Sequence, residues 1–150
     1  MVKVTYNGNE YKVAKNTKVI DFMKNTLKIK NDNVIACKAF YEIKSLNFEL
    51  DRDTNLELID TTTQDGSRIY VRGLTFILIK AFEELFPGKK LIVNYALGHT
   101  LYCDSPDVKL KQSDIKLIKE KMNEIISANI PFEKRILTLD EAMNLYEKER

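Results

Sequence analysis

The chain has 150 residues, with 24 basic and 22 acidic side chains and a formal net charge of +2 at pH 7. Hydrophobic residues make up 44% and charged residues 31%, which is typical of chains that bury a core and excludes disordered or strongly basic tails. No apolar run approaches the roughly 20 residues of a membrane span, and the first residues lack the layout of a secretory signal. We therefore expect a globular, cytoplasmic protein with no membrane partner.

The first part of the chain is predicted to form a small sheet with one helix. Apolar residues alternate on both sides of the turn at 7–9, which predicts a hairpin over 2–13. An apolar stripe at near-helical spacing predicts a helix of about three turns over 17–29. Three further strands are expected, at 34–40, 48–50 and 56–59. This order of elements predicts a β-grasp sheet.

The second part is predicted to be mostly helical. The polar run 61–67 is the boundary, and we expect a hinge there. The pattern then predicts a helix over 74–85 that ends at Pro87-Gly88, strands at 91–93 and 100–103, a charged helix over 115–126 and a strand at 132–137. A final helix is expected to begin at a capping box formed by Thr138 and Glu141 and to run to the end of the chain.

The residue inventory excludes several kinds of catalytic and metal site. His99 is the only histidine, and Cys37 and Cys103 are the only cysteines. One imidazole and two distant thiols form neither a disulfide framework nor a metal-ligand spacing. None of the five glycines belongs to a phosphate-binding loop, and no serine stands in a nucleophile elbow. These features favour a binding or regulatory module over an enzyme, and they predict no metal site.

Four side chains are candidates for a ligand site. Arg72, expected near a helix start, could bind an anion there, although a surface arginine of no special role is the simpler explanation. His99, Tyr102 and Asp104 could form the wall of a polar pocket, because their groups are complementary in hydrogen bonding; a turn histidine without a role is the alternative. Cys103 is expected to be a small buried hydrophobic residue, since no base or cation that could activate it is nearby in the sequence.

Aromatic and basic residues could also contact a nucleic acid. Tyr6, Phe40 and Tyr41 could present rings on which bases stack, but core packing explains the first two, which leaves Tyr41 as the exposed member. The lysines of 109–121 could meet phosphate, but acidic residues are interleaved among them, as on a solvated helix face. Charge alone therefore does not indicate a partner.

The order of elements and several short motifs resemble a known pair of modules across nearly the whole chain. Residues 1–61 resemble a TGS domain, a small ubiquitin-like β-grasp module. Residues 65–150 resemble the second N-terminal domain of threonyl-tRNA synthetase, the editing domain. The similar motifs in that part are Asp65-Gly66-Ser67-Arg68-Ile69, Leu85-Phe86-Pro87, Leu101-Tyr102-Cys103-Asp104, Leu110 to Ile115, Lys121-Met122 and Ile130-Pro131-Phe132. The resemblance implies an α+β chain with a TGS module followed by an α/β editing-like module.

The chain departs from this pattern at two places. The editing domain has a His-x-x-x-His pair that aligns with Arg72 and Phe76, and neither of these residues can bind metal as imidazoles do. We therefore expect no editing activity, and because the remaining ligands of that family lie beyond residue 150, we expect an incomplete domain. In the TGS part, Phe40-Tyr41 replaces the usual Asn-Gly of the turn after the third strand.

The same two modules, with the same loss of histidines, resemble the N-terminal region of bacterial uridine kinase-like proteins. In this preferred interpretation the chain is a non-catalytic regulatory or ligand-binding region. It has no cofactor of its own, its partner is a downstream kinase domain that uses ATP or GTP with magnesium, and its ligand is a small anion or nucleotide. The alternative is the TGS and degenerate editing region of a threonyl-tRNA synthetase, which would contact RNA. A purely structural assembly domain is the third possibility.

Overall fold

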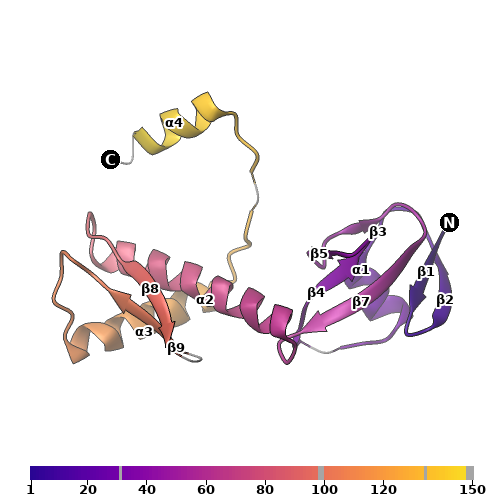
Figure 1. Cartoon of the computed structure of the whole chain (residues 1–150), viewed down its shortest axis with the longest axis horizontal. Coiled ribbons are helices and arrows are strands. Elements are labelled where there is room, and N and C mark those ends of the chain that lie inside the picture. Colours follow the sequence, from indigo (N-terminus) through magenta and orange to yellow (C-terminus); the bar gives the residue numbers. More distant parts are fainter. Residues whose placement is uncertain (31, 98–99, 134, 148–150) are drawn as a thin grey trace. The chain divides into compact units, whose positions relative to one another are not determined.

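Figure 1 shows a computed structural model of the chain, which describes residues 1–30, 32–97, 100–133 and 135–147. The chain divides into two units, Met1–Leu78 and Ile79–Arg150. The first unit contains a mixed β-sheet with a short helical segment, and the second contains a two-stranded hairpin with helices. The fold class expected from the sequence, a β-grasp module followed by an α/β module, is confirmed.

The sheet of the first unit has the strand order β2-β1-β7-β4-β5. Its strands are β1 (Val2–Tyr6), β2 (Asn9–Val13), β4 (Val34–Ala39), β5 (Glu42–Lys44) and β7 (Thr54–Asp60). β1 and β2 form the predicted hairpin, and β7 runs parallel to β1 in the middle of the sheet while β4 pairs antiparallel to β7. A parallel pair between the first and the last strand is what a β-grasp fold requires, because the intervening chain must cross over one face.

The helix predicted over 17–29 is shorter in the structure. The segment forms β3 (Thr17–Lys18), α1 (Val19–Asp21) and the π-helical turn η1 (Phe22–Thr26), and β3 pairs with β6 (Glu49–Leu50). The Leu27 N–H donates to the Phe22 carbonyl at 3.1 Å, which makes a wide final turn, and Lys28 has a left-handed φ of 57°. A left-handed residue cannot continue a right-handed helix, so the helix ends there.

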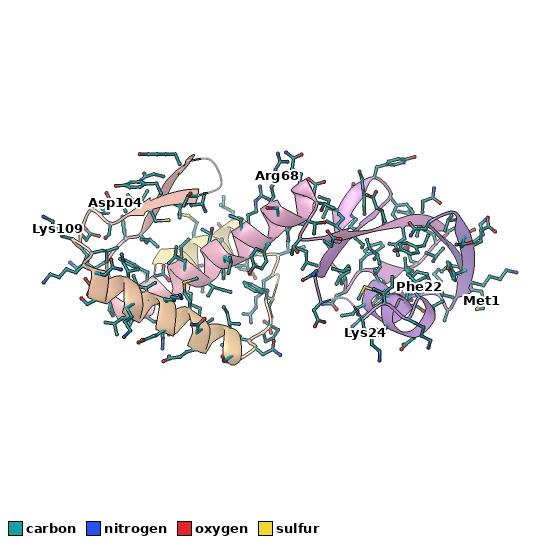
Figure 2. The ribbon with its side chains drawn as sticks, turned by 90° about the horizontal axis from the view of Figure 1, so that it is seen from below. Met1, Phe22, Lys24, Arg68, Asp104 and Lys109 are labelled. Atoms are coloured by element: carbon teal, nitrogen blue, oxygen red, sulfur yellow. The ribbon has the colours of Figure 1, made fainter. Side chains whose placement is uncertain are left out.

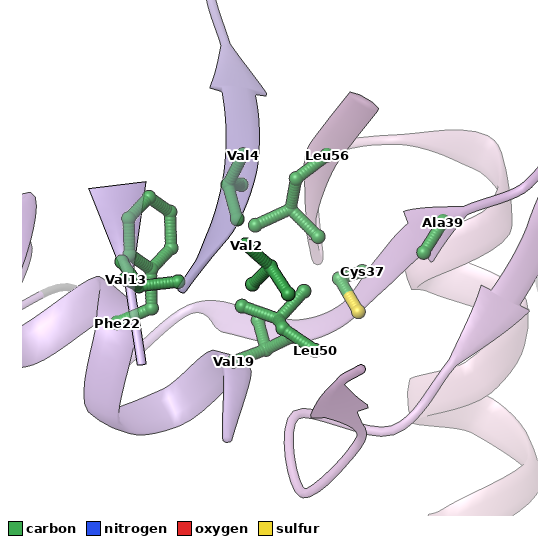
Figure 3. Packing of buried hydrophobic residues seen from close by; sticks show 9 residues of the cluster. All are labelled: Val2, Val4, Val13, Val19, Phe22, Cys37, Ala39, Leu50 and Leu56. Atoms are coloured by element: carbon green, nitrogen blue, oxygen red, sulfur yellow. The ribbon is translucent and has the colours of Figure 1, made fainter. Parts of the chain in front are cut away.

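Nine buried hydrophobic residues pack together between the sheet and this helical segment, as Figure 3 shows: Val2, Val4, Val13, Val19, Phe22, Cys37, Ala39, Leu50 and Leu56. The alternation of β1 places Val2 and Val4 on the inner face. Phe22 is fully buried, and its ring meets that of Tyr11 edge to face at 5.6 Å. Figure 2 shows Phe22 directed into this unit and Lys24 directed outward, as the helical spacing predicts.

The helix α2 (Gln64–Leu85) begins ten residues earlier than its apolar stripe predicts. The Thr63 hydroxyl accepts the Gly66 N–H at 3.0 Å, which is an N-terminal cap, so the polar run after β7 starts the helix instead of interrupting the chain. The residues of the predicted hinge that remain outside regular structure are 61–63. The predicted division of the chain into domains 1–61 and 65–150 stays a prediction. The boundary between the two units of the structure falls between Leu78 and Ile79, inside α2.

The second unit contains the end of α2, the antiparallel hairpin of β8 (Ile92–Leu97) and β9 (Thr100–Asp104), α3 (Gln112–Ser127) and α4 (Leu139–Glu147). Ala81, Phe82 and Ile118 are its buried hydrophobic residues among those described. Lys121 of α3 forms an ion pair with Glu84 of α2 at 3.1 Å. Hydrogen bonds from the ammonium groups of Lys80 and Lys121 hold the pKa of the Glu84 carboxyl below its usual value.

The strand predicted at 132–137 is wrong. The described residues of this segment form no strand, and Phe132 and Ile136 are 68% and 88% exposed. Apolar composition alone does not make a strand, because a strand needs a neighbouring chain to complete its ladder. The capping box that follows is confirmed: the Glu141 carboxylate accepts the Thr138 N–H at 2.8 Å, and the Thr138 hydroxyl accepts the Glu141 N–H at 3.4 Å.

Candidate functional site

Arg72 lies within α2 and not at its start. The helix begins at Gln64, so the free N–H groups of its first turn lie two turns before Arg72. The expected position of Arg72 at a helix start is therefore wrong, whereas binding of an anion by Arg72 stays a prediction. Arg72 and Phe76 are both exposed and four positions apart, so they share one face of the helix, where an imidazole pair would also lie together.

A guanidinium and a phenyl ring at these two positions do not fit a metal centre. The guanidinium stays protonated and the ring has no donor atom. Within the ranges that the structure describes, no three His, Cys, Asp or Glu side chains are close enough together to hold a metal ion. Residues of this chemistry do not support metal-dependent hydrolysis on this helix.

Two of the predicted pocket residues lie on β9. Tyr102 is 45% exposed, and its ring stacks on that of Tyr95 with centroids 5.3 Å apart and planes 19° apart. The two residues are cross-strand partners, so the hairpin register explains the stack. Sequence reasoning missed Tyr95, although its position on the opposite strand of the hairpin was the available signal. His99 lies outside the described residues.

Asp104 ends β9 beside a hollow of about 450 Å³, which is also lined by residues of the loop before α3, among them Lys109 (Figure 2). The Asp104 carboxylate accepts the Ser105 N–H at 2.8 Å, and the Asp107 carboxylate accepts the Lys90 N–H at 2.9 Å. Both carboxylates therefore brace the loop. Ser105 is 7% exposed, and its hydroxyl has no hydrogen-bond partner.

The predicted site residues thus fall into two groups. Tyr102 and Asp104 belong to the second unit and Arg72 to the first. Cys103, between Tyr102 and Asp104, is half-buried, and burial raises the pKa of its thiol. A thiol with a raised pKa is a weak nucleophile at neutral pH. The full burial expected for Cys103 is not found, because its side chain is only partly covered.

The turn between β4 and β5 is the second feature of interest. Phe40 and Tyr41 occupy its two central positions with φ of 54° and 63°, which is the geometry of a two-residue hairpin turn that normally takes Asn-Gly. Tyr41 is 95% exposed, which confirms the exposure expected from the sequence. Phe40 is half-buried, with its ring edge to face against Phe48 at 6.4 Å and the Arg52 guanidinium 4.3 Å from its centre.

A hollow of about 390 Å³ lies beside this turn and is confined to the first unit. It is lined by Lys38, Phe40, Tyr41, Asp53, Thr54, Asn55, Leu56 and Glu57. Along β7 the buried Thr54 and Leu56 alternate with the exposed Asn55 and Glu57. The hollow therefore combines an aromatic wall with polar side chains from two strands.

Comparisons with known proteins show similarity to threonine–tRNA ligases. The ligase of Desulforamulus reducens is 28% identical over 99% of this chain and 24% of its own length, and that of Clostridium kluyveri is 27% identical over the same shares. The ligase of Ligilactobacillus salivarius is 31% identical over 74% of this chain and 17% of its own length. No family model matches the chain. The chain thus spans about a quarter of the length of the relatives that it matches over almost all its residues.

These similarities agree with the resemblance to the TGS and editing-like modules. They favour the synthetase-related interpretation over the uridine kinase interpretation, which none of these relatives supports. In the described part of the chain, no helix combines the length and hydrophobicity needed to cross a bilayer.

Proposed function

We propose that this chain is an RNA-contacting region related to the TGS and editing modules of threonyl-tRNA synthetases, and that its editing centre is not functional. The observation that carries the proposal is similarity to threonine–tRNA ligases along 99% of the chain, combined with Arg72 and Phe76 at the positions where the editing domain carries histidines. The first feature favours a tRNA as partner. The second argues against hydrolysis of a mischarged tRNA.

The proposed role is binding, because Arg72 and Phe76 supply neither a metal ligand nor a base at the positions of the histidines, and the described residues offer no activated nucleophile in their place. The Cys103 thiol has a raised pKa, and no cluster of metal-binding side chains is present in the described ranges. The interleaved charges of the chain, 24 basic and 22 acidic, favour recognition of particular RNA features over non-specific attachment to phosphates.

Two assays on the full chain test the two parts of this proposal. Fluorescence anisotropy with a labelled threonine tRNA transcript should show saturable binding, and a tRNA of unrelated specificity serves as the control. A deacylation assay with seryl-tRNA should show no hydrolysis above the uncatalysed rate, and metal analysis should find no stoichiometric zinc. Absence of tRNA binding would contradict the RNA role, and hydrolysis or bound zinc would contradict the loss of editing.

A further inference from the structure

The backbone of the turn Phe40-Tyr41 is strained, because its two residues are unfavourable for the conformation that they adopt. Two bulky aromatic residues both adopt left-handed φ values, 54° and 63°, where Asn and Gly are the favourable residues. A left-handed conformation costs an L-residue free energy because its Cβ crowds the neighbouring carbonyl oxygen. Tyr41 recovers almost none of this cost by packing, because it is 95% exposed. A costly residue that packs against nothing is a candidate for binding.

The surroundings hold the two rings in different ways. Phe40 is anchored between Phe48 and the Arg52 guanidinium, at 6.4 and 4.3 Å between centres. This anchoring fixes the turn and projects Tyr41 beside the hollow of about 390 Å³. That volume lies in the range of roughly 300–1,000 Å³ found for small-ligand pockets, so one flat heterocycle can enter beside the ring.

The hollow also carries groups that match the edge of a base. Asn55 and Glu57 lie exposed on β7, and the register places Lys38 opposite Glu57 on β4. Amide and carboxylate groups can pair with the donors and acceptors of a base edge. The Lys38 side chain, which lines the hollow, provides a cation for an adjoining phosphate. The Asp53 carboxylate is already occupied, because it accepts the Lys3 N–H at 2.8 Å.

From this arrangement we infer that the Tyr41 turn binds an unpaired RNA base, which stacks on the Tyr41 ring while its edge faces the hollow beside β7. This inference deepens the proposed RNA-contacting function and rests on it. Single-stranded RNA is recognised by stacking on exposed aromatic rings together with hydrogen bonds to base edges. The hollow offers both requirements, an aromatic wall from Phe40 and Tyr41 and polar side chains from β4 and β7.

The charge balance of the first unit makes the inference more specific. Residues 1–78 carry 12 basic and 10 acidic side chains, so counterion release contributes little and stacking must supply most of the affinity. Binding through this turn should therefore depend weakly on salt concentration, whereas binding dominated by phosphate contacts falls steeply as salt is added.

The test uses the full chain with two probes, a short fluorescein-labelled oligoadenylate and the threonine tRNA transcript. Wild type should bind oligoadenylate with weak salt dependence. Tyr41→Ala should weaken this binding by roughly tenfold, because base stacking on an aromatic side chain contributes on the order of that factor or more. Tyr41→Phe keeps the ring and should bind within about twofold of wild type. Tyr70→Ala, which removes a tyrosine outside the hollow, is the matched control and should bind like wild type.

Two readouts separate this inference from the proposed function. NMR spectra of the wild-type protein should show chemical-shift changes for the Tyr41 ring and for Asn55 when oligoadenylate is added. This readout does not depend on whether the Tyr41→Ala variant folds. If the tRNA binds while Tyr41→Ala leaves both affinities unchanged, the stacking inference is wrong and the RNA role stands; the ring would then be available for a protein contact. If oligoadenylate binds through Tyr41 but threonine tRNA does not, the inference stands and the synthetase-related role fails.

Discussion

The Cα of Gly66 lies against the backbone carbonyl of Asp60, so that a Cβ added to Gly66 would be 1.8 Å from that oxygen. The Thr63 hydroxyl forms part of the same junction: it donates to the Asp60 carbonyl at 2.8 Å, and its oxygen accepts the Gly66 N–H at 3.0 Å. The end of β7 and the first turn of α2 are thus joined by direct contacts. A side chain at position 66 would separate them.

Gly66→Ala should therefore destabilise the protein by about 2 to 4 kcal/mol, since it forces the backbone apart and breaks the Thr63 cap. The free energy of unfolding is measured by urea denaturation with circular dichroism. Gly73→Ala is the matched control on the same helix, because an added Cβ there meets nothing within 4 Å. It should stabilise the helix by about 0.5 to 1 kcal/mol. Equal effects of the two substitutions would contradict this account of the junction.

Tyr41→Gly should stabilise the protein by about 1 kcal/mol, because it relieves a left-handed L-residue whose side chain contributes almost no packing. Urea denaturation measures the gain. Tyr41→Ala is the control that removes the same ring but keeps a Cβ at φ 63°, and it should give no comparable gain. If Tyr41→Gly were destabilising, the turn would not be under the strain that its φ angles indicate.

The buried Cys37 thiol should make stability fall at alkaline pH. Burial raises its pKa to about 11, whereas in the unfolded chain the value is about 8.5. Below pH about 8.5 the thiol is protonated in both states and its contribution is fully present. Above that pH the unfolded chain releases the proton first, so stability falls as pH rises towards the folded value, by on the order of 1 to 2 kcal/mol near pH 10.

Urea denaturation at intervals from pH 8 to 10 measures this loss. Cys37→Ala is the control: it is less stable overall because it leaves a cavity, but its stability should fall less steeply with pH than that of wild type. Parallel pH profiles for the two proteins would show that Cys37 is not the titrating group.

Asp60 should titrate at low pH in a way that depends on Thr62. Hydrogen bonds from the Thr62 hydroxyl at 2.5 Å and the Thr62 N–H at 2.9 Å hold the pKa of the Asp60 carboxyl below its usual value. The resulting stabilisation is present above the unfolded pKa and is lost as pH falls through the folded one. NMR titration of the Asp60 carboxyl carbon should show a higher pKa in Thr62→Ala. Thr61→Ala leaves both bonds in place and should not change it.

Features that depend on neighbours in the sequence were predictable. The β1–β2 hairpin follows from its alternation and turn residues, and the capping box of Thr138 and Glu141 needs only the spacing of two side chains. The exposure of Tyr41 was also predicted from the sequence, because core packing accounted for Tyr6 and Phe40 and left Tyr41 as the exposed aromatic residue. In these cases the interacting groups lie within a few residues of each other.

The start of α2 was missed because its apolar stripe begins late, and the junction that starts the helix depends on Gly66 meeting Asp60 in space. The Tyr95–Tyr102 stack depends on the hairpin register. The strand expected at 132–137 is not formed by the described residues there, because apolar composition alone does not specify strand pairing. Arg72 was wrongly placed near a helix start because the helix was predicted from its apolar stripe, whereas α2 already begins at Gln64.

The sequence by itself determined the β-grasp pattern and the identities of Arg72, Phe76, Phe40 and Tyr41, which the resemblance aligns with histidines in the editing domain and with Asn-Gly in the TGS domain. These are properties of residue identity and local spacing. Only the tertiary structure decided that Phe40 is anchored by Phe48 and Arg52 and that Tyr41 stands beside a hollow lined by β7. A pocket requires side chains from strands distant in the sequence to converge, and their separation is set by sheet pairing, which local propensity does not specify.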